Sequence, residues 1–300
     1  MRYRPFGISG KAVSAISLAL GRSGPGDAAG WRRIMFSAME LGVNCFDFEC
    51  GEEAQERGIA LGLQAVERRL IFLICTVRAE PRQPFSVERL AETLKRALTR
   101  TNAGYFDVVM FDQAVYAELT PKARMLLRRL RDAVLVLQVG VRGDAKDLDP
   151  AVADPEIDVL STAYNLTSDW RTRRVLREAS AAGMTVVGSE PAPITMAKPA
   201  PQPKTGLLGR RERHNPLQGV GTYAFLHSTP NWKAEELCVA YALTEPAIAT
   251  VQVDMTQIDL LETLCGVPER DPPTALGAQV EMARCGGDGE ADQSAAPGAA

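Results

Sequence analysis

The sequence lacks the features that would place it in several protein classes. It has only two histidines, no cysteine pair in a C-x-x-C arrangement, and no run of about eighteen apolar residues. These absences argue against a metal site and against a transmembrane helix. The N-terminal residues MRYRPFGISG also lack the apolar stretch of a secretory signal. Because no segment carries a dominant basic block, we expect neither nucleic acid nor a membrane as a partner.

The six cysteines are scattered along the chain, and several of them lie inside apolar runs. Reduced, buried thiols explain this distribution better than disulfides do, because the spacing shows no regular framework. We therefore expect a reducing compartment, the cytoplasm. The cysteines are Cys45, Cys50, Cys75, Cys238, Cys265 and Cys285.

Short β-rich runs alternate with helical patterns along the 300 residues, of which 46% are hydrophobic and 24% charged. This alternation predicts βαβ units and a parallel sheet, and residues 71–77 are almost entirely apolar, as in a strand buried on both faces. Eight alternations after a hairpin at 2–6 and 11–14 predict a (β/α)8 TIM barrel with an N-terminal β-hairpin. The strands are expected at 16–21, 44–49, 71–77, 106–111, 134–141, 159–164, 185–188 and 250–253.

Residue types that are preferred at helix ends and in loops set the expected limits of the elements and of the domain. Thr120 and Pro121 have the types preferred at the N-cap and first position of a helix, and Gly42 suits the residue just after one. We assign residues 1–267 to the barrel, interrupted by a Pro- and Gly-rich irregular loop at about 191–230. Residues 268–300 are small and polar and predict a mostly disordered C-terminal tail.

Several segments, taken in order, carry a family resemblance. They are the opening hairpin and strand at 1–21, A-x-x-x-G-V-N-C-F-D at 38–47, G-I-A-L at 58–61, Thr76, Y-F-D at 105–107, G-V at 140–141, Y-N at 164–165 and T-E-P at 244–246. Over about residues 1 to 265 the chain resembles the aldo-keto reductases. The resemblance implies a barrel that reduces carbonyls with NADPH, with its working residues at the C-terminal ends of the strands.

The catalytic positions implied by the resemblance are mostly changed in this sequence. The family uses a tyrosine as proton donor, and lysine, aspartate and histidine tune it, because a phenol with its ordinary pKa of about 10 donates poorly at neutral pH. Only the aspartate is retained. The four positions read Asp47 for the aspartate, Cys50 or Glu52 for the tyrosine, Val77 followed by Arg78 for the lysine, and Asp112 for the histidine.

The positions that would bind the cofactor are changed as well. A carboxylate where basic side chains would hold a 2′-phosphate is repulsive, so we expect no nicotinamide cofactor; a divergent oxidoreductase would still need NADP. The matching residues are Arg142 and Gly143 for the carboxamide-binding pair, Ser161 for a glutamine, Ser189 followed by Glu190 for the stacking aromatic, and Asp254 for the phosphate-binding region.

Charged residues at the expected strand ends leave two interpretations open. Asp47, Glu49, Asp112, Glu190 and Asp254 would surround the mouth together with Arg78 and Arg142. Grouped carboxylates perturb each other's pKa values and can carry out acid-base chemistry, whereas carboxylates paired with arginine are structural. We favour the paired, structural interpretation, and for Cys50 an inert thiol over a nucleophile.

Three functions remain. The first is a non-standard or regulatory barrel that lacks hydride-transfer chemistry and binds a small molecule or a partner protein. The second is a cofactor-independent acid-base enzyme of the lyase or isomerase type, which uses mouth carboxylates. The third is a divergent NADP(H)-dependent oxidoreductase acting on a small carbonyl substrate. The losses described above favour the first two.

Overall fold

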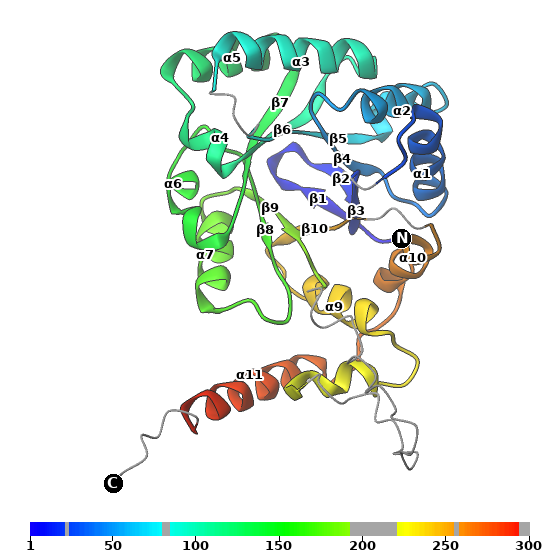
Figure 1. Ribbon diagram of the computed structural model, residues 1–300, viewed down its shortest axis with the longest axis vertical. Helices are drawn as coiled ribbons and strands as arrows, with labels where there is room; N and C mark the ends of the chain where they lie inside the picture. Colours follow the sequence, from blue (N-terminus) through cyan, green and yellow to red (C-terminus); the bar gives the residue numbers. More distant parts are fainter. Residues whose placement is uncertain (22–23, 80–84, 193–220, 255–257, 294–300) are drawn as a thin grey trace, which may run out of the picture.

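Eight parallel strands close into a barrel, which confirms the predicted TIM fold (Figure 1). The computed structural model describes residues 1–21, 24–79, 85–192, 221–254 and 258–293. Around the ring the strand order is β10-β3-β4-β5-β6-β7-β8-β9, so sequential strands are neighbours and the last pairs with the first. The strands are β3 (Ile16–Ala19), β4 (Cys45–Glu49), β5 (Phe72–Val77), β6 (Phe106–Asp112), β7 (Val136–Arg142), β8 (Val159–Ala163), β9 (Thr185–Ser189) and β10 (Ile248–Asp254).

Helices cover the outside of the barrel, and side-chain caps begin several of them. Thr120 accepts a hydrogen bond from the backbone of Ala123 at 3.3 Å, with Pro121 at the first helical position as predicted. Asp27 accepts one from Gly30 at 2.6 Å, which caps the first helix at its start, Ala28. The helices are α1 (Ala28–Glu40), α2 (Glu53–Leu63), α3 (Val87–Thr101), α4 (Gln113–Ala117), α5 (Pro121–Asp132), α6 (Asp149–Val152), α7 (Trp170–Ala181), α9 (Ala234–Leu243), α10 (Ile258–Cys265) and α11 (Leu276–Gln293).

The predicted hairpin, β1 (Tyr3–Phe6) with β2 (Lys11–Ser14), fills the N-terminal end of the barrel. Phe6 and Val13 are fully buried among inward-facing residues of the barrel strands, and the Phe6 ring lies 4.3 Å from that of Phe72. Because these side chains occupy the interior at this end, the barrel is closed there.

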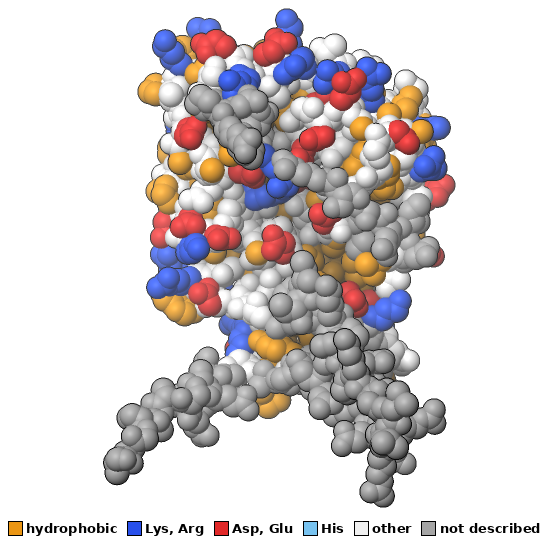
Figure 2. All heavy atoms as spheres, viewed as in Figure 1, with side chains coloured by type: hydrophobic (Ala, Val, Ile, Leu, Met, Phe, Trp, Pro, Cys, Tyr) orange, Lys and Arg blue, Asp and Glu red, His pale blue; other side chains and the backbone are white. Residues whose placement is uncertain are grey.

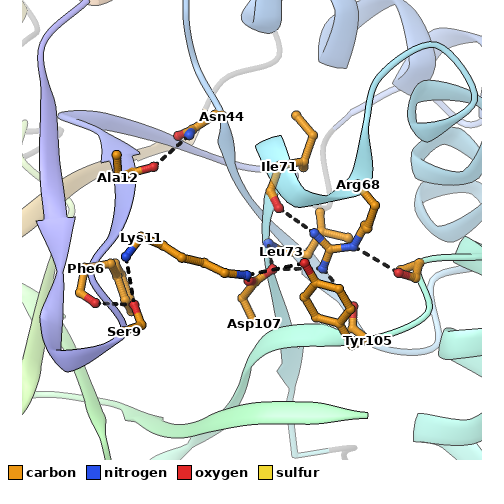
Figure 3. A network of polar contacts seen from close by, with 11 residues as sticks. Phe6, Ser9, Lys11, Ala12, Asn44, Arg68, Ile71, Leu73, Tyr105 and Asp107 are labelled. Carbon is orange, nitrogen blue, oxygen red and sulfur yellow. Dashed lines mark hydrogen bonds and ion pairs between the residues drawn. The ribbon is translucent and has the colours of Figure 1, made fainter. Parts of the chain in front are cut away.

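A network of charges fastens the hairpin to the barrel wall (Figure 3). Asp107, on β6, is 1% exposed and lies 2.5 Å from the Lys11 ammonium and 2.8 Å from the Arg68 guanidinium. It also accepts the backbone N–H of Leu73 at 2.9 Å. Arg68 stacks on the Tyr105 ring at 4.0 Å. One buried carboxylate thus joins the hairpin, β5 and β6.

The C-terminal region differs from the disordered tail expected for residues 268–300. The structure contains helix α11, in which Leu276, Val280 and Ala283 are buried. These residues recur at helical spacing and form a narrow apolar stripe that the small and polar composition obscures. Arg284 fastens the helix by donating to the Leu166 carbonyl at 2.9 Å and to the Tyr241 hydroxyl at 3.1 Å.

The predicted irregular loop is described only in part. Residues 193–220 lie outside the described residues, and Gly221–His227 forms a short 3-10 helix, η4, which packs against α11. None of the described helices combines the length and apolar character that a membrane span requires. On the face in Figure 2, acidic and basic side chains are interspersed over α3 and α5.

Candidate functional site at the barrel mouth

The candidate site lies where the eight parallel strands end, opposite the hairpin. Side chains alternate between the interior and the helices along each strand. On β4, Phe46 and Phe48 pack toward the helices, whereas Cys45 packs with the interior residues. Asp47 and Glu49 follow Cys45 at the same period and therefore belong to the interior face. We define the mouth cluster as Asp47, Glu49, Arg78, Asp112, Arg142 and Asp254.

Asp47 is 3% exposed, and its carboxylate is fully engaged by protein groups. One oxygen accepts from the Thr76 hydroxyl at 2.5 Å, and the other accepts from the Gln252 amide at 2.8 Å and from the Arg142 guanidinium. A buried carboxylate needs such partners, because burial without them costs several kcal/mol. Both oxygens of Asp47 therefore have hydrogen-bond donors from the protein itself.

Arg142 reaches across the mouth from β7 to Asp47 on β4, three strands away around the ring. It also donates to the Gln252 side chain at 2.8 Å and to the Ser161 hydroxyl at 3.4 Å. Burial opposes the charged guanidinium, but the charge and hydrogen bond of Asp47, together with the charges of Asp112 and Glu49, outweigh it and raise the pKa of Arg142. The result is a polar layer that spans the barrel from β4 and β5 to β7, β8 and β10.

A second ion pair flanks this layer on the side of β4 and β5. The Arg78 guanidinium lies 2.8 Å from the Glu49 carboxylate, which is almost buried, whereas Arg78 is 41% exposed. The backbone N–H of Glu49 donates to the Gln55 side chain at 3.0 Å, which fixes the turn from β4 into α2. The interpretation of paired mouth carboxylates thus describes Asp47 and Glu49 correctly.

Asp112 and Asp254 have a different electrostatic setting. For each, loss of hydration in the surrounding protein raises the pKa of the carboxyl above its usual range, and Arg78 and Arg142 offset this only in part. The charges of Asp47 and Glu49 act in the same direction as the burial. The mouth cluster therefore holds four carboxylates and two guanidiniums, an excess of two formal negative charges.

Of the predicted site residues, the structure brings some together and separates others. Ser161 contacts Arg142 directly, and Asp112 lies opposite Arg142 in the register of β6 with β7. Among the described residues, no hydrogen bond or ion pair joins the remaining four to Asp47 or Arg142. These four are Cys50, which packs on the helix side; Glu52, an exposed residue before α2; Ser189, which is half-buried; and Glu190, which is exposed with a φ of 48°.

The sequence analysis missed Gln252 as a member of the polar layer. A signal was present, because Thr250, Gln252 and Asp254 alternate with apolar residues along β10 and so share the interior face. In the described ranges no group of three or more histidine, cysteine, aspartate or glutamate side chains, the mouth carboxylates included, is placed to hold a metal ion.

The tyrosines lie elsewhere in the molecule, and all six belong to the part of the chain that the structure describes. Their hydroxyls contact groups outside the mouth cluster. The contacts are Tyr3 with the Gly42 carbonyl, Tyr105 with Lys11, Tyr116 with Asp154, Tyr164 with Glu245, Tyr223 with the Leu166 carbonyl, and Tyr241 with Arg284. The mouth thus has a carboxylate and a cation but no phenol beside them.

Comparisons with known proteins identify the same fold. No family model and no curated protein matches the sequence. Among solved structures, the chain is similar to the aldo-keto reductase AKR11C1 from Bacillus halodurans in its holo form, with a TM-score of 0.76, 20% identity, and coverage of 94% of this chain and 96% of that one. A putative aldo-keto reductase from Pseudomonas aeruginosa aligns with a TM-score of 0.63, 19% identity, and coverage of 88% and 94%. The chain therefore has an aldo-keto-reductase-like barrel.

Proposed function

We propose that this protein is an aldo-keto-reductase-like barrel that does not perform NADPH-dependent carbonyl reduction and instead binds a small polar molecule or a partner protein. The observation that carries the proposal is the ion pair between Asp47 and Arg142. It uses the one catalytic residue retained from the family resemblance as a structural partner of an arginine.

Carbonyl reduction in this family depends on a phenol that a neighbouring ammonium makes a better acid. Asp47 instead accepts hydrogen bonds from Thr76, Gln252 and Arg142, so its charge is matched by a guanidinium and not by an ammonium. The six tyrosine hydroxyls have their partners elsewhere. These contacts support the loss of the hydride-transfer machinery.

The residues at the cofactor positions do not fit a nicotinamide dinucleotide. Arg142 occupies the position of a carboxamide-binding residue and is held by Asp47, and Ser161 faces the same guanidinium. The carboxylate excess at the mouth repels the phosphates of such a cofactor. We assign no step of any reaction to NADP(H).

A direct titration of the purified chain with NADPH and NADH, by calorimetry and by cofactor fluorescence, tests the proposal. We expect no saturable binding up to millimolar cofactor, with an active aldo-keto reductase as the positive control. Micromolar binding would overturn the proposal and favour the divergent oxidoreductase, to be followed by a screen of small carbonyl substrates.

A second candidate is a redox-neutral acid-base enzyme, and the setting of Asp112 and Asp254 favours it. A carboxyl whose pKa is raised can hold a proton closer to neutral pH and donate it to a substrate. Asp47 is less suited to this role, because its oxygens are already occupied. A bound substrate would need to reach Asp112 and Asp254 from the open end of the barrel.

A further inference from the structure

An open groove lies beside the hairpin, at the end of the barrel that the hairpin closes. Its volume is about 550 Å³, within the range of about 300 to 1,000 Å³ that pockets for small organic molecules have. Its lining comes from the hairpin, from the chain between α1 and β4, and from the 3-10 helix η2 (Arg68–Leu70) that leads into β5. The six mouth-cluster residues, all described, lie outside this lining, so the groove is a separate site.

Apolar side chains form most of the groove surface. Tyr3 is 51% exposed and Leu70 is 56% exposed, and both belong to the lining. The Tyr3 ring is held in place, because its hydroxyl donates to the Gly42 carbonyl at 2.9 Å. A Cβ at Gly42 would lie 3.3 Å from this hydroxyl and 2.8 Å from the Met1 Cβ, so the close approach needs a glycine. Exposed apolar walls that are held in position suit the apolar body of a ligand.

The charged side chains of the groove have one sign. Among the described residues the lining contains two cations, Lys11 and Arg69, and no carboxylate. The Lys11 side chain extends from the hairpin to the barrel wall (Figure 3), where its ammonium lies 2.5 Å from Asp107 and 3.3 Å from the Tyr105 hydroxyl. An ammonium has three N–H donors, so one is left for a further acceptor. Asp107 also pairs with Arg68, so one negative charge there faces two positive charges.

Arg69 is the more accessible of the two cations. Its guanidinium lies 2.6 Å from Glu67, and both side chains are largely exposed. Such a surface pair contributes little to stability and is screened by salt, and Glu67 itself is outside the lining. A carboxylate in the groove can therefore compete with Glu67 for Arg69.

We propose that this groove binds a small organic anion with an apolar body, such as an aliphatic carboxylate. The apolar body lies against Tyr3 and Leu70 and removes their exposed surface from water. The carboxylate accepts charge-assisted hydrogen bonds from the remaining N–H of Lys11 or from the Arg69 guanidinium. The carboxylate excess at the mouth repels the same molecule. The inference depends only on the groove, so it stands or falls separately from the proposed function of the mouth.

Calorimetric titration with octanoate, and with 1-octanol as a probe of similar length without the charge, tests the proposal. We expect one octanoate to bind per chain, and octanol to bind about tenfold more weakly because the cations have no charge to meet. The octanoate affinity should also fall as salt is added, because ions screen the cations of the groove. Absence of octanoate binding, or equal affinity for the two probes, overturns the proposal.

Variants locate the bound anion. Leu70→Asp replaces part of the apolar wall with a carboxylate and should weaken octanoate binding by about tenfold or more. At least one of Arg69→Gln and Lys11→Met should weaken it by about threefold. Two controls should bind octanoate like the parent: Met125→Asp, which changes a 46% exposed apolar residue of α5 outside the lining, and Asp254→Asn at the mouth.

Three results with these variants overturn the proposal. Equal weakening by Leu70→Asp and Met125→Asp would mean that octanoate binds without a defined site, and weakening by Asp254→Asn would place it at the mouth. Unchanged affinity in both Arg69→Gln and Lys11→Met would remove the role of the cations. Sedimentation velocity covers the remaining occupant, since a dimer that Leu70→Asp converts to a monomer would show a second copy of the chain in the groove.

Discussion

The two ends of this barrel each hold a buried carboxylate beside arginine, yet the two carboxylates have different surroundings. At the closed end, Asp107 is matched by Lys11 and Arg68 and lies beneath a hairpin. At the open end, Asp47 is matched by Arg142, but Asp112 and Asp254 add negative charge that the two arginines do not balance. A carboxylate that contacts cations on both sides suits a permanent joint, whereas carboxylates in excess of the cations around them are typical of a site that meets a ligand.

The largest expected loss of stability follows from a substitution at the closed end of the barrel. Asp107→Ala leaves Lys11 and Arg68 without their carboxylate and the Leu73 N–H without its acceptor, so we expect unfolding to become easier by about 4 kcal/mol. Urea unfolding followed by circular dichroism measures this. Asp149→Ala, which removes an exposed partner of Arg174, is the control and should cost about 0.5 kcal/mol or less. Equal losses in both variants would show that the joint has no special role.

The next effect concerns the open end. Arg142→Met leaves Asp47 buried without its cation, and we expect a loss of about 3 kcal/mol at neutral pH. In the double variant Asp47→Asn with Arg142→Met, stability should recover in part. A double variant no more stable than Arg142→Met alone would mean that the pair does not govern stability here.

The smallest expected change in stability tests the excess of carboxylates at the open end of the barrel. Because the pKa of folded Asp112 is raised, the folded state binds its proton more tightly than the unfolded state does. The contribution of protonated Asp112 to the free energy of unfolding is present below the ordinary carboxyl pKa of about 3.9. It is lost as the pH rises through the raised pKa of the folded state. Between about pH 4 and pH 7 the Asp112→Asn variant should therefore have a higher free energy of unfolding than the parent, by about 0.5 kcal/mol after solvent screening.

Unfolding free energies at several pH values measure this gain, and Asp254→Asn should show the same sign. If the difference between either variant and the parent did not change with pH, the carboxylates of Asp112 and Asp254 would be as fully compensated by cations as that of Asp107 is. The acid-base alternative would then lose its support.

Local patterns in the sequence were enough to predict most of the fold. The apolar run of β5 and the Thr120-Pro121 start of α5 depend on neighbouring residues alone, and both are confirmed. Helix α11 was missed because only three residues, Leu276, Val280 and Ala283, provide its apolar stripe.

The candidate site was predictable in position but not in its contacts. The family resemblance placed Asp47, Asp112 and Arg142 at strand ends, where the structure has them. Arg142 extends to Asp47 and not to Asp112. This contact depends on the side-chain conformation of Arg142 and on Gln252, which lies on β10, a distant strand. Such a contact cannot be predicted from local sequence patterns, because it joins residues 95 positions apart in the chain.

The hairpin that fills one end of the barrel makes the molecule a cup and not a tube. Phe6 and Val13 block passage along the axis, so anything that approaches Asp47 from solvent must arrive and depart through the same opening. A substitution at the strand ends therefore affects entry and exit alike, because the hairpin leaves no second route along the barrel axis.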